Sequence, residues 1–185
     1  MSLPNAHKIP QTPLLKSCLL REKVNVLELG TGCGIIGISL AICFENVEVV
    51  ITDLPEAKDI ATFNLEQNRR HGPGQRIAVT YENLDWTQAV TERRISNDLD
   101  LIVAGDVTYN SDMIPDLVKT VASLIGSGTR TRFLVAMKVR HDSEAVFFDL
   151  MTQAGLKIVE RLTIPMPVLA QDDQAIEIYL FGRVA

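Results

Sequence analysis

The chain has 185 residues, of which 46% are hydrophobic and 22% are charged, and its formal net charge is −5. These values are typical of a globular chain with a buried core, so we expect residues 1–185 to form a single domain. The negative charge argues against nucleic-acid binding by bulk electrostatics, and the longest apolar run, near residues 35–44, is too short to cross a bilayer. The three cysteines lack metal-ligand spacing, and no secretory segment opens the chain. We therefore predict no metal site, and a cytoplasmic protein with the nucleus left open.

Residues 1–12 are expected to form a loop or arm, followed by a short helix and the first strand at residue 24. Strands are predicted at residues 24–29, 47–52, 77–81, 99–104, 131–137, 156–160 and 176–181. Helices are predicted at residues 35–44, 55–69, 111–125 and 143–154. The sequence Gly72–Pro73–Gly74 is expected to break the second of these, and Ser111 or Asp112 is expected to cap the third. Alternation of this kind predicts an α/β fold with a Rossmann-like, doubly wound, seven-stranded sheet. The last two strands are joined without a helix, so the last strand is expected to be antiparallel.

Residues 24–37 have the pattern of a buried strand, a glycine turn and a helix. Gly30, Gly32 and Gly34 remove the Cβ atoms where the backbone must bend and let a ligand approach closely. A helix that begins at such a turn directs unpaired amides toward a ligand. The dinucleotide-binding motif G-x-G-x-x-G does not match when it is started at Gly30, because its sixth position is then Ile35 and not a glycine. It matches only when it is started at Gly32. A structural turn without a ligand is the alternative.

In a doubly wound sheet, ligands bind outside the carboxyl ends of the strands, so the residue after each strand is a candidate. Asp53 closes the second strand, 23 residues after Gly30. A carboxylate there can accept both ribose hydroxyls of a nucleoside, although an acid that favours a helix N-terminus is the alternative. Asp85 and Trp86 follow the third strand and can bracket an adenine by hydrogen bonding and stacking. A lone tryptophan is more often a core residue.

The fourth strand ends in small residues followed by a carboxylate and a phenol. Gly105 has no side chain at a position where a ligand would have to lie close to the backbone. Asp106 and Tyr109 are three residues apart and are expected to face one acceptor molecule at the ligand edge of the sheet. A capped loop with a core tyrosine is the alternative.

Two amides and three histidines are given no chemical role. Asn64 and Asn68 fall on one face of a predicted helix and are expected to hold the backbone near the glycine turn. His7, His71 and His141 are scattered and lie beside no nucleophile pattern, so we interpret them as surface residues.

Together these segments resemble the seven-strand S-adenosylmethionine-dependent methyltransferases of the protein-lysine type that carry a D-x-x-Y motif (methyltransferase family 16). The glycine turn has that family's form, acid-x-Gly-x-Gly-x-Gly, from Glu28 to Gly34. The resemblance covers residues 24–182. The matching segments are residues 27–34, residues 52–55, Asn64 with Asn68, residues 84–86, residues 106–109, and residues 136–140 with Phe147 and Phe148.

The resemblance implies methyl transfer from S-adenosylmethionine to a lysine side chain of a protein. It implies that Asp106 and Tyr109 are catalytic and frame the entrance for the target lysine. Cofactor contacts are implied at Glu28, Gly30, Thr31, Gly32, Asp53, Leu54, Asp85, Trp86 and Gly105. Family members carry a longer N-terminal region with a tryptophan that closes over the cofactor, so residues 1–23 are expected to form a shortened arm.

Three alternatives stay open at this point. The first is a small-molecule N- or O-methyltransferase on the same fold, since a fold does not determine a substrate. The second is a cofactor-binding or interaction protein without turnover, and the weakest is a nicotinamide-dependent oxidoreductase. The signature Asn-Pro-Pro-Tyr of base and glutamine N-methylation is absent from the sequence, so no nucleic-acid partner is expected.

Overall fold

A computed structural model gives the structure of the chain. It describes residues 13–69, 77–88, 95, 98–127, 130–138, 143–165 and 175–183. The expected arm at residues 1–12, the helix break at Gly72–Pro73–Gly74 and the three histidines lie outside these residues.

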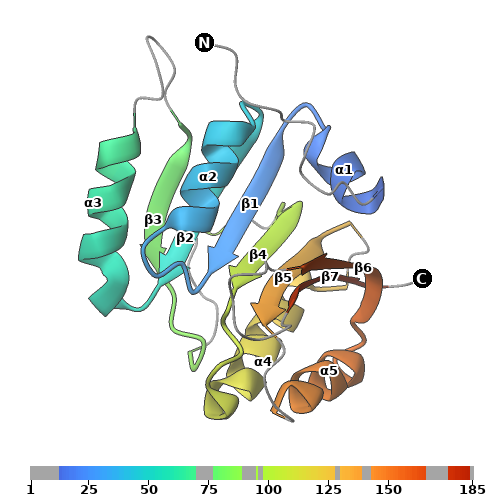
Figure 1. The fold of residues 1–185 in the computed structure, drawn as a ribbon. Helices are drawn as coiled ribbons and strands as arrows, with labels where there is room; N and C mark the ends of the chain where they lie inside the picture. Colours follow the sequence, from blue (N-terminus) through green and yellow to red (C-terminus); the bar gives the residue numbers. More distant parts are fainter. Residues whose placement is uncertain are drawn as a thin grey trace.

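One seven-stranded sheet runs through the described part of the chain in the order β3-β2-β1-β4-β5-β7-β6 (Figure 1). Strands β1 to β5 are parallel to one another, whereas β7 lies between β5 and β6 and is antiparallel to both. This arrangement confirms the predicted doubly wound sheet with an antiparallel last strand. The strands are β1 (Val24–Leu29), β2 (Val47–Asp53), β3 (Val79–Asn83), β4 (Leu101–Gly105), β5 (Arg132–Lys138), β6 (Lys157–Pro165) and β7 (Ala175–Gly182).

Helices cover both faces of the sheet (Figure 1). On one face lie α1 (Pro13–Leu19), α2 (Ile35–Cys43) and α3 (Lys58–Asn68), the last preceded by the short helix η2 (Pro55–Ala57). On the other lie α4 (Ile114–Ile125), preceded by the short helix η3 (Ser111–Met113), and α5 (Ser143–Gln153). Because strand side chains alternate between faces, Val24 and Val26 enter the core under α2, and Leu27 and Leu29 enter the core on the α4 side.

Every strand except β1 differs from its predicted range at one or both ends, and the differences at β3 and β6 are the most informative. Strand β3 spans residues 79–83 instead of 77–81, and β6 runs on to Pro165, where a loop was predicted after residue 160. Proline lacks an amide donor, so it is tolerated at the end of an edge strand. Pro165 is the last residue of β6, which is the edge of the sheet, and it pairs with Ala175 of β7.

The cap of the helix predicted at residues 111–125 is also corrected. The cap was expected at Ser111 or Asp112, but the side chain of Asn110 accepts a hydrogen bond from the Asp112 amide at 3.1 Å. Asparagine, serine and aspartate at residues 110–112 are all favourable N-cap residues, so their identity does not distinguish between them. The helical backbone begins directly after Asn110, which makes Asn110 the cap.

Candidate functional site

The candidate site lies at the carboxyl ends of the parallel strands. The chain passes from β1 outward to β2 and β3, and then crosses to β4 and β5 on the other side of β1. The strand order therefore reverses between β1 and β4, which is where ligands bind in open α/β sheets. The segments that follow β1, β2 and β4 meet at this edge (Figure 1).

The glycine turn after β1 has a left-handed backbone at each of its three glycines. The φ angles are 66° at Gly30, 53° at Gly32 and 87° at Gly34, a region that glycine enters without a steric penalty. A Cβ on Gly30 would lie 2.9 Å from Val107 and 3.3 Å from the ring of Trp86. A Cβ on Gly32 would meet no atom within 4 Å. The turn is thus packed on one side and open at Gly32.

The carboxylate of Glu28 lies beneath this turn, with 1% of the residue exposed. Its Oε2 accepts hydrogen bonds from the Thr31 hydroxyl at 2.6 Å and from the Gly37 amide at 2.9 Å. Burial raises the pKa of Glu28 to about 7, even though both hydrogen bonds lower it. Glu28 and Thr31 were both predicted as cofactor contacts, and in the structure their side chains bind each other inside the protein.

Asp53 at the end of β2 reaches the open side of the turn. Its Oδ2 accepts a hydrogen bond from the Gly32 amide at 2.7 Å, and its Oδ1 accepts one from the Leu54 amide at 2.8 Å. The Leu54 carbonyl in turn accepts a hydrogen bond from the Tyr81 hydroxyl at 2.9 Å. The structure therefore brings Asp53 and Leu54 to the glycine turn. The contribution of Tyr81 was not predicted, and only its position near the end of a strand could have indicated it.

Asp85 and Trp86 follow β3. Asp85 Oδ1 accepts hydrogen bonds from the amide and the hydroxyl of Thr87 at 2.9 and 2.8 Å, which forms an Asx-turn. Trp86 is half-buried, packs against the hydrophobic core on the α4 side and places its ring edge beside Gly30. Trp86 is thus both a core residue and a neighbour of the turn.

The segment after β4 alternates between exposed and buried residues. Asp106 and Tyr109 are exposed, whereas Val107 and Thr108 between them are buried. Tyr109 is therefore not the core tyrosine of the alternative interpretation. Asp106 has a φ of 53°, the one positive value outside glycine among the described residues, and its amide donates to the Ala136 carbonyl. Backbone strain of this kind often accompanies functional sites.

Gly105 has a neighbour that was not expected. A Cβ at this position would lie 2.4 Å from Cδ1 of Ile36 in α2. The small residue at the end of β4 therefore makes room for a side chain of α2, and its contact with a ligand stays a prediction.

Of the two asparagines on α3, one has the predicted role. Asn64 Nδ2 donates to the Cys33 carbonyl at 2.8 Å and so ties α3 to the glycine turn, which confirms the prediction. Asn68 donates to the carbonyl of Asn64 within the helix, so the expectation that Asn68 holds the turn is wrong.

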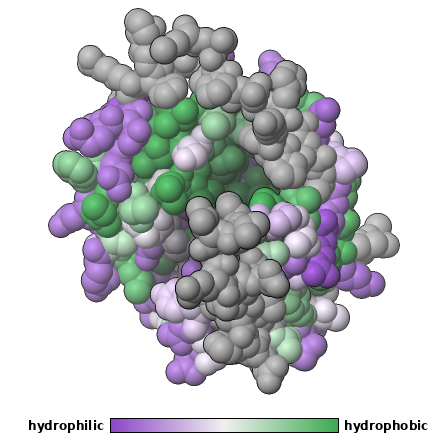
Figure 2. All heavy atoms as spheres, viewed as in Figure 1, coloured by the Kyte–Doolittle hydropathy of each residue, from purple (hydrophilic) through white to green (hydrophobic). Residues whose placement is uncertain are grey.

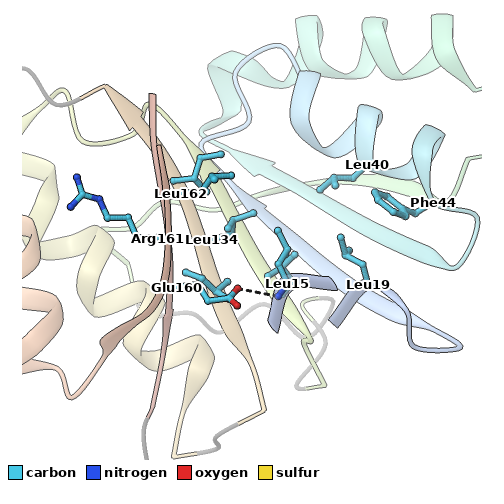
Figure 3. Close-up of a pocket in the computed structure, with 11 residues that line it drawn as sticks. Leu15, Leu19, Leu40, Phe44, Leu134, Glu160, Arg161 and Leu162 are labelled. Atoms are coloured by element: carbon cyan, nitrogen blue, oxygen red, sulfur yellow. Dashed lines mark hydrogen bonds between the residues drawn. The ribbon is translucent and has the colours of Figure 1, made fainter. Parts of the chain in front are cut away.

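A second recess has a different character. It lies on the face that carries α1 and α2, where Figure 2 shows a hollow of hydrophobic residues and Figure 3 its lining. We call it the apolar groove. Leu40 of α2, Phe44 directly after α2, Leu134 of β5 and Leu162 of β6 line it, together with Leu15 of α1. Glu160 of β6 borders it and accepts hydrogen bonds from the first amides of α1.

The described residues contain neither a membrane-crossing helix nor a cluster of side chains suited to a metal ion. Each helix there is too short or too polar to cross a bilayer. No group of three or more His, Cys, Asp or Glu side chains in these ranges has an arrangement that could hold a metal ion.

The fold is that of the class I S-adenosylmethionine-dependent methyltransferases. A SAM-dependent methyltransferase from Methanosarcina mazei matches 95% of this chain and 99% of its own, with a TM-score of 0.67 and 12% identity. The precorrin-6y C5,15-methyltransferase from Geobacter metallireducens matches 92% of this chain and 86% of its own, with a TM-score of 0.63 and 11% identity.

Within this class, the chain belongs to the lysine methyltransferase family, whose model matches residues 12–154. A UPF0665 family protein from Schizosaccharomyces pombe is 35% identical over 70% of this chain and 38% of its own length. Calmodulin-lysine N-methyltransferase from Arabidopsis thaliana is 30% identical over 72% of this chain and 43% of its own. EEF1A lysine methyltransferase 3 from Mus musculus is 30% identical over 69% of this chain and 52% of its own. The chain thus spans about two fifths to half of the length of these relatives.

Proposed function

We propose that this chain transfers a methyl group from S-adenosylmethionine to a lysine side chain of a protein. The observation that carries the proposal is the Asp53 carboxylate, which lies at the glycine turn 2.7 Å from the Gly32 amide. Membership of the lysine methyltransferase family supports the reaction. The names of the relatives that act on lysines of calmodulin and EEF1A support a protein as the substrate.

The residues at the turn fit the cofactor. Gly32 faces open space, and each oxygen of the Asp53 carboxylate accepts one amide hydrogen bond. A carboxylate oxygen has two lone pairs, so Asp53 retains capacity for the ribose hydroxyls. Asp85 and Trp86 would contact the adenine, and Gly30, Leu54 and Gly105 would complete the site. When bound, S-adenosylmethionine supplies an activated methyl group on a positively charged sulfur.

Glu28 and Thr31 would act on the cofactor through the turn. Glu28 accepts hydrogen bonds from the Thr31 hydroxyl and from the Gly37 amide at the start of α2. These bonds join the two ends of the bend. We assign both residues to holding the turn from beneath and not to direct cofactor contact.

Asp106 and Tyr109 would orient the lysine amine. Neutralising a lysine at pH 7 costs about 4–5 kcal/mol from its reference pKa of about 10.4. A carboxylate favours the charged amine, so Asp106 is not suited to reduce that cost. We therefore assign Asp106 and Tyr109 to positioning, with the proton passing to water. Holding the two reactants in line would supply most of the rate.

Labelled S-adenosylmethionine, incubated with a cell extract and the protein, should place label on lysines detected by mass spectrometry. Asp106→Ala and Tyr109→Phe should bind S-adenosylhomocysteine normally by calorimetry while losing transfer. Full activity in both variants would refute their assignment. Label in an extractable small product would favour the small-molecule alternative, and a protein that does not bind S-adenosylhomocysteine would leave only an interaction role.

A further inference from the structure

Four exposed apolar side chains lie in the segments that follow the carboxyl ends of β1, β2 and β4. Ile35 begins α2 directly after the glycine turn, Ile60 and Phe63 lie on α3, and Tyr109 follows β4. Their exposed fractions range from 49% to 78%. We call these four residues the rim patch.

The hydrogen bond from Asn64 to the Cys33 carbonyl places one flank of α3 beside the turn. Ile60 is four residues before Asn64 and therefore lies on the same flank. Ala61 and Leu65 bury a different side of the helix against the sheet. Ile60 and Phe63 are both exposed, Ile60 on the flank that carries Asn64 and Phe63 on the side away from the sheet.

Large exposed apolar side chains are unevenly distributed over the described part of the chain. Single exposed apolar residues are normal on a protein surface, but a group of them marks an interaction site. Most of the large exposed apolar residues in the described part of the chain lie in segments that follow the carboxyl ends of strands. They are Ile35, Leu54, Ile60, Phe63, Tyr109 and Val146, against Leu14, Leu20 and Ile158 elsewhere.

The same edge of the sheet is acidic. The segments after β2, β3 and β4, residues 53–59, 84–88 and 105–116, hold seven carboxylates and one lysine, Lys58. The whole chain has 23 acidic and 18 basic residues, so the excess of negative charge is concentrated at this edge. The next strand, β5, ends with Lys138. The carboxylates are Asp53, Glu56, Asp59, Asp85, Asp106, Asp112 and Asp116.

We infer that the rim patch docks a basic segment of the protein substrate that carries an apolar side chain close to the target lysine. This inference rests on the proposed function and names the class of sequence that the site accepts. Apolar contacts on Ile60 and Phe63 would seat the segment, since exposed aromatic and aliphatic side chains anchor interfaces. The carboxylates around them would attract flanking arginines or lysines and repel acidic segments.

The test uses three fluorescently labelled 15-residue peptides, each with one lysine, and measures their binding to the full chain by anisotropy. The first peptide has arginines and isoleucines around the lysine. In the second, glutamates replace the arginines, and in the third, serines replace the isoleucines. We expect the first to bind about tenfold tighter than either of the others, and to weaken as salt is raised.

Two variants connect binding to this surface. Ile60→Ser with Phe63→Ser should weaken the first peptide about fivefold or more, and Glu56→Lys with Asp59→Lys should weaken it through charge. Ile158→Ser, at an exposed apolar position on β6, should leave it unchanged. All three proteins should bind S-adenosylhomocysteine as the unaltered chain does.

The possible failures are distinguishable. Equal affinities for the three peptides, or affinities that neither double variant changes, would overturn the docking inference while cofactor binding stands. Absence of S-adenosylhomocysteine binding would instead overturn the proposed function, whatever the peptides do.

Discussion

The glycine-turn edge and the apolar groove are two recesses built by opposite means. At the turn, left-handed glycines and short hydrogen bonds bring amides and a carboxylate together. In the groove, leucine and phenylalanine side chains of α1, α2 and four strands form the lining (Figure 3). A polar ligand needs convergent polar groups, so the turn is suited to a charged cofactor and the groove is not.

The two recesses also depend on different parts of the chain. The turn is held by bonds that span 3 to 31 residues, from the bond of Thr31 to Glu28 up to the bond of Asn64 to Cys33. The groove depends on a contact between Glu160 and Leu14, which are 146 residues apart. The comparison therefore predicts that changes at the turn alter ligand affinity and that changes at the groove alter stability alone.

The largest effect is expected for Asp53→Ala. It removes the carboxylate proposed to bind the ribose and the acceptor of the Gly32 amide. Hydrogen bonds to a charged group are worth about 1.5–3 kcal/mol each, so the affinity for S-adenosylhomocysteine, measured by calorimetry, should fall about a hundredfold. Leu162→Ala in the groove is the matched control and should change that affinity less than about twofold. Similar losses in both variants would erase the distinction between the recesses.

The next effect concerns the pH dependence of stability. The pKa of Glu28 is raised by burial from its ordinary value of 4.5 to about 7, so the folded chain keeps a proton that the unfolded chain has lost. The free energy of unfolding should therefore fall as the pH rises from about 4.5 to about 7, by on the order of 3 kcal/mol, and then level off.

Urea denaturation at several pH values measures this contribution. Glu28→Gln should remove it from the profile, and Glu48→Gln, an exposed position on β2, should leave the profile unchanged. A profile for Glu28→Gln as steep as that of the unaltered chain would contradict the assignment.

A pair of glycine substitutions should separate packing from binding at the turn. A Cβ on Gly37 would lie 2.4 Å from Cγ2 of Ile51, whereas one on Gly32 would meet open space. Gly37→Ala should lower the unfolding free energy by about 2 kcal/mol through overpacking. Gly32→Ala should cost about 1–2 kcal/mol for its left-handed backbone and should lower the affinity for S-adenosylhomocysteine more. Calorimetry and denaturation on both variants measure these two quantities. A larger loss of S-adenosylhomocysteine affinity in Gly37→Ala than in Gly32→Ala would count against the proposed site.

The smallest effect is expected for Glu160→Gln beside the groove. Its carboxylate accepts the Leu14 amide at 2.8 Å and the Leu15 amide at 3.3 Å, and so acts as a cap for α1. Loss of a helix cap costs about 1 kcal/mol. Thermal unfolding should report that loss, with S-adenosylhomocysteine affinity unaltered. A change in affinity would mean that the groove and the turn are coupled.

The sequence by itself determined the doubly wound sheet, the glycine turn and the place of Asp53, Asp106 and Tyr109 at its carboxyl edge. These features follow from local rules, since strand and helix periodicity, positive-φ glycines and the edge at which parallel strands end are all readable along the chain. Tertiary structure alone decided that β7 lies between β5 and β6, that Glu28 is buried and that Ile36 fills the space at Gly105. It also extended β6 to Pro165 as an edge strand. Each of these depends on which distant residues pack together, and a local pattern of hydrophobic and polar residues does not specify its partner.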